Sequence, residues 1–395
     1  MSKNKAFFFF LVFVYLFIYA MGNALPIFSA SALEEKGIED KLNENIIGQI
    51  EKLDLDELQN YIDNLQGFTK QNVAQRLLDY IRGENFDYVN FGEELTNVLF
   101  KKCREMFPAF ACIIAVTLLS GLISSLNSGS IAKTSSTIIY FISYVCTLIP
   151  LLGVLTECIL VSKKCITDMQ TQMQLFFPIM LTLIAASGGS VTVGVSSPAV
   201  AFFSSTIVNV INSIVLPFTV VILGLSIAGN FSNELNIGKF STFFKSINKW
   251  IIGICVSVFG LFFTLQGITS STYDGIVRRA AKYAIGNGVP IIGGFLSGGF
   301  DLAVAGGILI KNSLGSMSIV LLVFILFEPL VLLICVNVLL RFSAAVTQPF
   351  GDSRISNFLA STADNLNYCT ASLLFTAFMY FLSIIILISS TEALL

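Results

Sequence analysis

The chain has 395 residues, of which 55% are hydrophobic and 12% are charged, and its formal net charge is −2. From residue 107 to the end, only 21 side chains are charged, and the residues form apolar runs of bilayer-spanning length. No soluble domain buries so many Phe, Ile, Leu and Val residues in one core. The absence of histidine excludes His-Glu-x-x-His zinc sites and serine triads with a histidine base. The composition therefore predicts an all-α, polytopic integral membrane helical bundle.

The chain begins with a pattern typical of a secretory signal. Two lysines precede an unbroken apolar run, Ala6–Met21, and small residues follow at Gly22-Asn23-Ala24 and at Ala30-Ser31-Ala32. We expect residues 1–24 to form a signal peptide, with cleavage as late as residue 32 as an alternative. An uncleaved signal anchor is the other interpretation. In either case the chain is expected to be exported from residue 33 onward.

Residues 25–106 form an acidic segment that we expect to be exported and helical. Residues 33–106 contain 16 acidic and 9 basic side chains, whereas residues 107–395 contain 9 acidic and 12 basic ones. Apolar residues recur at helical spacing in three places, after candidate caps at Asp54, Thr69 and Asn90. These helices either cover the membrane surface and one another or dock a partner protein, and the sequence leaves both open.

The membrane domain is expected to comprise residues 107–395. Five apolar runs are clear spans: Phe107–Leu126, Thr137–Val161, Trp250–Ser270, Ser316–Leu340 and Thr370–Ser389. Three further segments are short or interrupted: Leu175–Ala186, Val191–Gly229 and Pro290–Ile310.

These segments predict about seven to nine crossings, with the C-terminus outside. The preferred arrangement assigns five basic residues to the cytoplasm, namely Arg278, Arg279, Lys282, Arg341 and Arg354. It assigns another basic group to the exported side, against the positive-inside rule; this group comprises Lys101, Lys102, Arg104, Lys163 and Lys164. Positive charge alone therefore does not settle the orientation.

A cluster of hydrogen-bonding side chains and glycines lies within the interrupted segments. Its candidate path-lining members are Ser187, Gly188, Gly189, Asn209 and Asn212. In hydrocarbon such groups need protein partners or water. The cluster indicates either a broken helix beside an aqueous path or polar contacts between closely packed helices, and we favour the path.

Glu328 lies in the middle of Ser316–Leu340, directly before Pro329. An ionised carboxylate is costly there unless it is paired, hydrated or protonated. Lys311 and Arg341 are the candidate cationic partners by depth, although both lie near span ends. We expect Glu328 to line a cavity or to bind a proton. The alternative is a neutral acid that donates to a backbone carbonyl freed by Pro329.

The eight cysteines are scattered and form no Cys-x-x-Cys pair, so they indicate no metal site. As small apolar side chains in helix packing, they need no function. Cys158 and Cys165 are close enough in sequence to meet on an oxidising side, but this spacing is weak evidence for a disulfide.

A recognisable order of residues runs from Gln266 to Gly315. Its pattern positions include Asp274, Arg279, Lys282, Asn287, Pro290, Lys311 and Asn312, with glycine and apolar neighbours between them. Related short patterns occur elsewhere, at Ala186-Ser187-Gly188-Gly189, Val215-Leu216-Pro217 and Gln348-Pro349. In this order the chain resembles the stage III sporulation protein AE family over nearly its whole length. The family supplies no catalytic residues to transfer.

The resemblance implies a membrane component, the core or export gate, of a sporulation-specific channel or secretion complex in the mother-cell membrane around the forespore. The expected partners are the other stage III A sporulation proteins, among them a cytosolic ATPase and ring-forming proteins, and a forespore-side channel protein. No enzymatic activity, cofactor, metal or nucleic-acid partner is expected. A secondary transporter for a small solute, with Glu328 and the polar cluster at its site, is the alternative. A scaffold that conducts nothing is a third.

Overall fold

The computed structural model describes residues 36–63, 72–82, 88–126, 132–231, 238–288, 293–350 and 353–390. All regular secondary structure in these ranges is helical, which confirms the predicted all-α fold. In chain order the helices are α2 (Lys36–Ile50), α3 (Asp56–Asp63), α4 (Val73–Arg82), α5 (Tyr88–Leu126), α6 (Ala132–Ala186), α7 (Ser190–Ala201), η1 (Phe202–Ile207), α8 (Val208–Val210), η2 (Ile211–Val215), α9 (Leu216–Phe231), α10 (Gly238–Gly288), α11 (Gly293–Phe350) and α12 (Ser353–Ser389). The two η elements are π-helical. The predicted signal segment lies outside the described residues.

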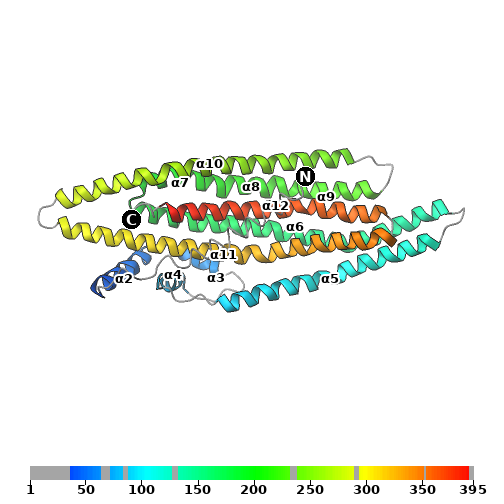
Figure 1. Ribbon diagram of the computed structural model, residues 1–395, viewed down its shortest axis with the longest axis horizontal. Coiled ribbons are helices and arrows are strands. Elements are labelled where there is room, and N and C mark those ends of the chain that lie inside the picture. Colours follow the sequence, from blue (N-terminus) through cyan, green and yellow to red (C-terminus); the bar gives the residue numbers. More distant parts are fainter. Residues whose placement is uncertain are drawn as a thin grey trace.

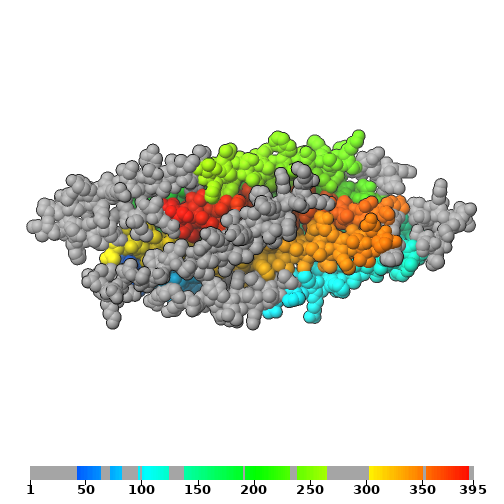
Figure 2. Space-filling model, in the orientation of Figure 1, coloured from blue at the N-terminus to red at the C-terminus, as the bar shows by residue number. Residues whose placement is uncertain are grey.

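The long helices lie side by side in one elongated bundle (Figure 1). α11 is central, because it packs against α12, α6, α5, α10, α2 and α4. α5 and α9 end at one end of the bundle, which we call the α5–α6 end, and α6 and α12 end at the other, the α6–α7 end. On the face shown in Figure 2, α10 in green, α12 in red, α11 in orange and α5 in cyan follow one another across the molecule.

Six helical stretches are long and apolar enough to cross a membrane, and the protein is a multi-pass helical membrane protein. They are Phe100–Ile123, Ile138–Ala186, Thr192–Phe231, Gly238–Thr264, Leu302–Pro349 and Ser353–Ser389. Within the described residues this is fewer than the seven to nine crossings expected from the sequence. The difference has a structural reason: Leu175–Ala186 continues α6 without a break, and the polar segment after Val191 stays helical from α7 to α9.

Three helices are much longer than a bilayer is thick. α6 has 55 residues, α10 has 51 and α11 has 58. At about 1.5 Å per residue each is roughly 75 to 90 Å long, whereas the hydrocarbon core of a bilayer is about 30 Å thick. A large part of the bundle must therefore lie outside the hydrocarbon core.

The short helices before the bundle match the expected exported helices in part. The Asp54 carboxylate accepts a hydrogen bond from the backbone N–H of Asp56 at 3.4 Å, where α3 begins. α4 is capped by Asn72, whose side chain accepts from the Ala74 N–H at 3.0 Å, and Thr69 lies outside the described residues. The third predicted helix is the first part of α5, which continues through Pro108 although proline removes one helical hydrogen bond.

The helices α2 to α4 dock on the side of the bundle near the α6–α7 end (Figure 1). α2 and α4 pack on α11, and α3 packs on α6. Their apolar faces are buried, with Ile46, Ile50, Leu58, Ile62, Val73 and Leu77 at most 4% exposed. These helices therefore cover the bundle itself, which the sequence did not predict.

Polar contacts fix where α2 and α3 dock. The Gln49 amide donates to the carbonyl of Ala303 on α11 at 2.8 Å. The Tyr61 hydroxyl donates to the carbonyl of Asp168 on α6 at 3.4 Å. Burial raises the pKa of the Tyr61 phenol well above its ordinary value, so this hydroxyl stays protonated and remains a donor.

Candidate functional site

The exposed side chains of α6 are mainly apolar in its first part and more polar from Lys163 onward. Between Ile138 and Leu160 its exposed residues other than glycine are Ile138, Phe141, Ile142, Cys146, Ile149, Leu152, Thr156 and Leu160, and the one hydroxyl among them donates to its own helix backbone. The charged side chain in this stretch, that of Glu157, is 40% exposed and lies close to its end. From Lys163 onward the exposed side chains are Lys163, Lys164, Thr167, Gln174, Pro178, Thr182, Ala185 and Ala186. The apolar part, residues 138–160, is roughly 34 Å long, which matches the hydrocarbon core of a bilayer.

Neighbouring helices expose apolar side chains at the same level. The Tyr144 hydroxyl of α6 donates to the Ile227 carbonyl of α9 at 2.7 Å, and Thr117 of α5 pairs with Thr347 of α11 at 3.1 Å. Around this level the large exposed side chains include Leu119, Leu122, Val220, Phe231, Phe240, Trp250, Val338 and Phe342. We call this zone, level with residues 138–160 of α6, the apolar belt. We call the remainder, toward the α6–α7 end, the polar half after the exposed face of α6; elsewhere in this half Phe202 of η1 and Leu261 of α10 are exposed.

Glu328 lies beside Lys102 of α5, near the border between the apolar belt and the polar half. Its Oε1 is 3.0 Å from the Lys102 Nζ, which also lies 3.5 Å from Glu105 and 4.0 Å from Glu157 of α6. We call these four residues the acidic cluster. The Lys102 side chain is 16% exposed and that of Glu328 is 53% exposed. Glu328 is therefore a paired carboxylate at an open position.

The cationic partners expected for Glu328 were wrong. Lys311 is 1% exposed and its ammonium donates to the carbonyl of Ile388 at 2.6 Å. This contact puts a positive charge at the C-terminal end of α12, where unpaired carbonyls and the helix dipole favour it. Arg341 is paired with Asp364 at 2.7 Å. The sequence did not indicate Lys102 as a partner, because this residue precedes Phe107–Leu126, the apolar run that is predicted to be the first span.

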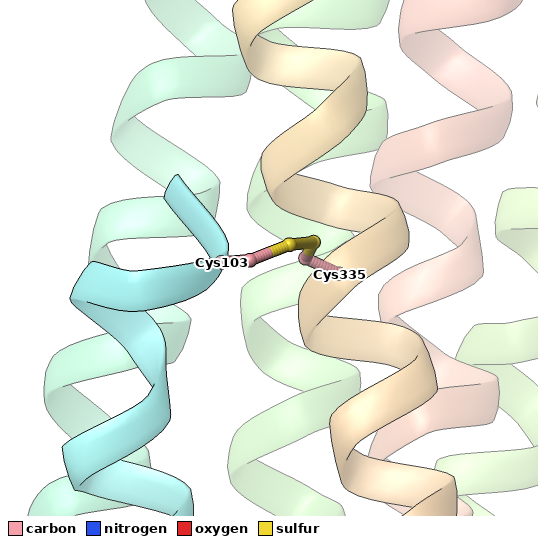
Figure 3. Close-up of a disulfide and its surroundings, with 2 residues drawn as sticks. All are labelled: Cys103 and Cys335. Atoms are coloured by element: carbon pink, nitrogen blue, oxygen red, sulfur yellow. A yellow bond between two sulfur atoms is a disulfide. The ribbon is translucent and has the colours of Figure 1, made fainter. Parts of the chain in front are cut away.

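A disulfide joins α5 to α11 next to the acidic cluster. Cys103 and Cys335 are bonded, with Cα atoms 6.2 Å apart (Figure 3), which is within the usual range for disulfides. Cys158 and Cys165, the pair considered from the sequence, are buried free thiols. No spacing rule indicates a bond between residues 232 positions apart.

Replacing Cys103 and Cys335 together by serine is expected to lower the stability of the bundle. Disulfides that close long loops contribute about 2 to 4 kcal/mol. The measurement is thermal unfolding in detergent with and without a reductant: reduction lowers the wild-type transition and leaves that of the double variant unchanged. Cys112 and Cys146 are exposed free thiols, so serine at both is the matched control. Eight reactive thiols in the unreduced, denatured wild type would contradict the bond.

Ser187, Gly188 and Gly189 form the turn between α6 and α7. The N–H of Gly189 donates to the Ile184 carbonyl at 2.9 Å and that of Gly188 to the Ala185 carbonyl at 3.0 Å. Gly188 has φ +91°, so this is a Schellman turn with glycine at its left-handed position. The Ser187 hydroxyl is only 2.8 Å from where a Cβ on Gly307 of α11 would lie. The three residues therefore sit at the α6–α7 end, where Ser187 is in close contact with α11.

Asn209 and Asn212 lie elsewhere, on or between the two π-helical turns. Gln170 of α6 donates to the Asn209 side chain at 3.4 Å, and Asn212 donates to the Thr167 hydroxyl at 3.2 Å. The predicted polar cluster is thus divided along the bundle, with about 20 helical residues, or about 30 Å, between its parts. We call the contact of Thr167, Gln170, Asn209 and Asn212 the polar seam. π-turns of this kind often occur at functional sites.

The other pattern positions fall on the long helices. Asp274, Arg279, Lys282 and Asn287 lie on the last third of α10, and Pro290 lies outside the described residues. Asn312 follows Lys311 on α11, and its buried Oδ1 accepts no hydrogen bond from the described residues.

Comparison with known proteins gives a consistent result. A family model described as stage III sporulation protein AE matches residues 72–391. The curated protein named Stage III sporulation protein AE from Bacillus subtilis (strain 168) is 23% identical over 325 residues, which cover 82% of this chain and 82% of that protein. No solved structure matches the chain significantly.

Proposed function

Since this chain belongs to the stage III sporulation protein AE family, we propose that it is the membrane core, or export gate, of a sporulation-specific channel between mother cell and forespore. The observation that carries the proposal is the exposed face of α6, which changes from an apolar stretch of bilayer thickness to a polar stretch within one continuous bundle. A protein built this way is anchored in one membrane and presents a folded body beyond it. Such a body suits an assembly that spans the gap between two membranes.

In this proposal the bilayer surrounds the apolar belt and the chain crosses it six times. The α5–α6 end faces the mother-cell cytoplasm, and the polar half, with α2 to α4 docked on it, lies on the exported side. Two basic residues near the α5–α6 end, Lys239 and Arg354, agree with the positive-inside rule, whereas Lys249 lies deeper, beside the contact of Asn248 with Thr219. The C-terminus is then outside, as expected from the sequence, whereas Arg278, Arg279 and Lys282 lie on the exported side instead of in the cytoplasm.

The polar half offers a surface for partners in the space between the membranes. From Lys163 to Ala186, α6 extends roughly 35 Å beyond the proposed hydrocarbon boundary. The polar seam opens on this part, because Thr167 and Asn209 are exposed. The ring-forming stage III A proteins are the proposed partners there. The cytosolic ATPase would act at the α5–α6 end and the forespore-side channel protein beyond the polar half.

Purification of the tagged full-length chain from membranes of sporulating cells tests this role. The tagged chain should restore heat-resistant spores to a deletion strain and should co-elute with the stage III A proteins. An uninduced culture expressing the same chain is the control. Undiminished sporulation of the deletion strain would contradict the proposal. So would saturable solute uptake by liposomes that contain this chain alone, because that result identifies a secondary transporter.

A further inference from the structure

One face of the first half of α12 carries small and polar residues in a continuous stripe. Its members recur at alternating steps of four and three residues: Ser353, Asn357, Ala360, Asp364, Asn367 and Ala371. All but Ala360 are exposed, and Ala360 is partly exposed. This spacing is that of a helix face that packs against another helix. We call these residues, with Asn337 and Arg341 of the adjacent α11, the α12 stripe.

The polar groups of the stripe form one network across α11 and α12. Arg341 Nη2 lies 2.7 Å from Asp364 Oδ1, and the two side chains are 41% and 48% exposed. Arg341 Nε donates to the Asn337 side chain at 2.9 Å, and Asn337 donates to Asn367 at 2.9 Å and to the Ala363 carbonyl at 2.8 Å. The network holds a cation, an anion and two amides in an open position.

The stripe lies at the depth of the apolar belt. Phe358 of α12 packs against Tyr144 of α6, with the rings tilted and their centroids 5.0 Å apart, and Ser361 pairs with Ser226 of α9 at 3.1 Å. On α11 the residues flanking Arg341 along the helix include Val338 and Phe342, which are 59% and 57% exposed.

Lipid is an unsuitable neighbour for this face. A half-exposed ion pair and amides in hydrocarbon are costly, and such groups in membrane proteins face protein or water. The apolar run Ala6–Met21 of this chain offers two hydroxyls, those of Tyr15 and Tyr19, but no amide or charged side chain for this network. A partner with strong net charge is equally unsuitable, because one arginine and one aspartate leave the stripe neutral.

We propose that the α12 stripe of one copy of this chain packs against the α12 stripe of a second copy. Copies in one membrane share their orientation, so they are related by an axis along the membrane normal and their stripes lie at the same depth. Each stripe then meets amides, small residues and an ion pair like its own, and Ser353, Ala360 and Ala371 allow the helices to approach closely. The chain is therefore a homo-oligomer with α12 at the contact. The inference rests on the bilayer position proposed above and does not depend on the cargo or on the other partners.

Single cysteines test the contact in membranes. The background carries serine at Cys112 and Cys146, the exposed free thiols. Asn357→Cys, Ala360→Cys and Asn367→Cys should each form disulfide-linked dimers on mild oxidation at low expression. Val220→Cys and Ile149→Cys, exposed in the apolar belt on other helices, are the matched controls and should stay monomeric.

Three results would overturn the contact. The first is an absence of dimers at all three stripe positions. The second is rapid reaction of stripe thiols with a membrane-impermeant maleimide without dimers, which indicates a water-lined face. The third is a link within one chain, seen as a monomer of altered mobility, which indicates that a segment of the same chain covers the stripe. All of these are scored without reference to spore formation, so they are separate from a failure of the proposed function.

Discussion

Cysteines placed along the exposed face of α6 are expected to divide into a reactive and an unreactive group. Gln174→Cys and Thr182→Cys, in the polar half, should react with a membrane-impermeant maleimide added to intact protoplasts of vegetative cells that express the chain, in which the exported side faces the medium. Ile142→Cys and Ile149→Cys, in the apolar belt, should not react even after permeabilisation. The reason is that maleimide reacts with the hydrated thiolate, which hydrocarbon suppresses.

The comparison is well matched because all four positions are exposed on one helix. The background again carries serine at Cys112 and Cys146. Labelling of Gln174→Cys only in permeabilised cells would place the polar half in the cytoplasm and reverse the proposed topology. Equal labelling of Ile149→Cys and Gln174→Cys would place the bilayer elsewhere along the bundle.

Reversal of charge at Lys102 is expected to have the largest effect of any single substitution in the acidic cluster. Lys102→Glu leaves four carboxylates together without a cation, so it should strongly reduce heat-resistant spores. Loss of one partner from a partly exposed ion pair costs only about 1 kcal/mol, and Glu328→Leu should therefore impair spore development more mildly, with insertion into the membrane unchanged. The double variant Lys102→Glu with Glu328→Lys should recover part of the loss.

The control is Lys101→Glu, because Lys101 precedes Lys102 on α5, is exposed and lies outside the acidic cluster. Spore counts are compared with the amount of chain in the membrane fraction, which separates a defect in function from a defect in insertion. If the double variant is no better than Lys102→Glu, the pairing of Lys102 with Glu328 is not what matters at this site. If Lys101→Glu is as harmful as Lys102→Glu, the effect is one of general surface charge.

The class of fold could be predicted because it depends on composition. A chain with so few charges after residue 107 can satisfy its backbone in lipid only as helices, and the helices are there. The number of crossings depends on where helices stop, and this was harder to predict. The Ser187-Gly188-Gly189 pattern suggested a break inside the membrane, but Gly188 is the C-terminal cap of a very long helix. A glycine pair after an apolar helix is itself a signal for such a cap.

The candidate site was predicted only in part. Glu328 stood out because its local sequence is apolar, whereas its partner Lys102 did not, since a lysine among other charges before Phe107 reads as an ordinary surface residue. The polar half of α6 left a signal in Lys163, Thr167 and Gln174, which recur on one face. However, apolar residues make up the rest of α6, and they hide this signal when the sequence is averaged over the whole helix.

The bond between Cys103 and Cys335 also sets an order of events during synthesis. Cys335 leaves the ribosome 232 residues after Cys103, so the first span must enter the bilayer and remain untethered while α6, α7 to α10 and most of α11 are still being made. Until Cys335 has been synthesised, no covalent bond can hold α5 beside α11. The disulfide forms only after Cys335 has been synthesised. It therefore stabilises only those chains in which the later segments have already inserted so that α11 lies beside α5.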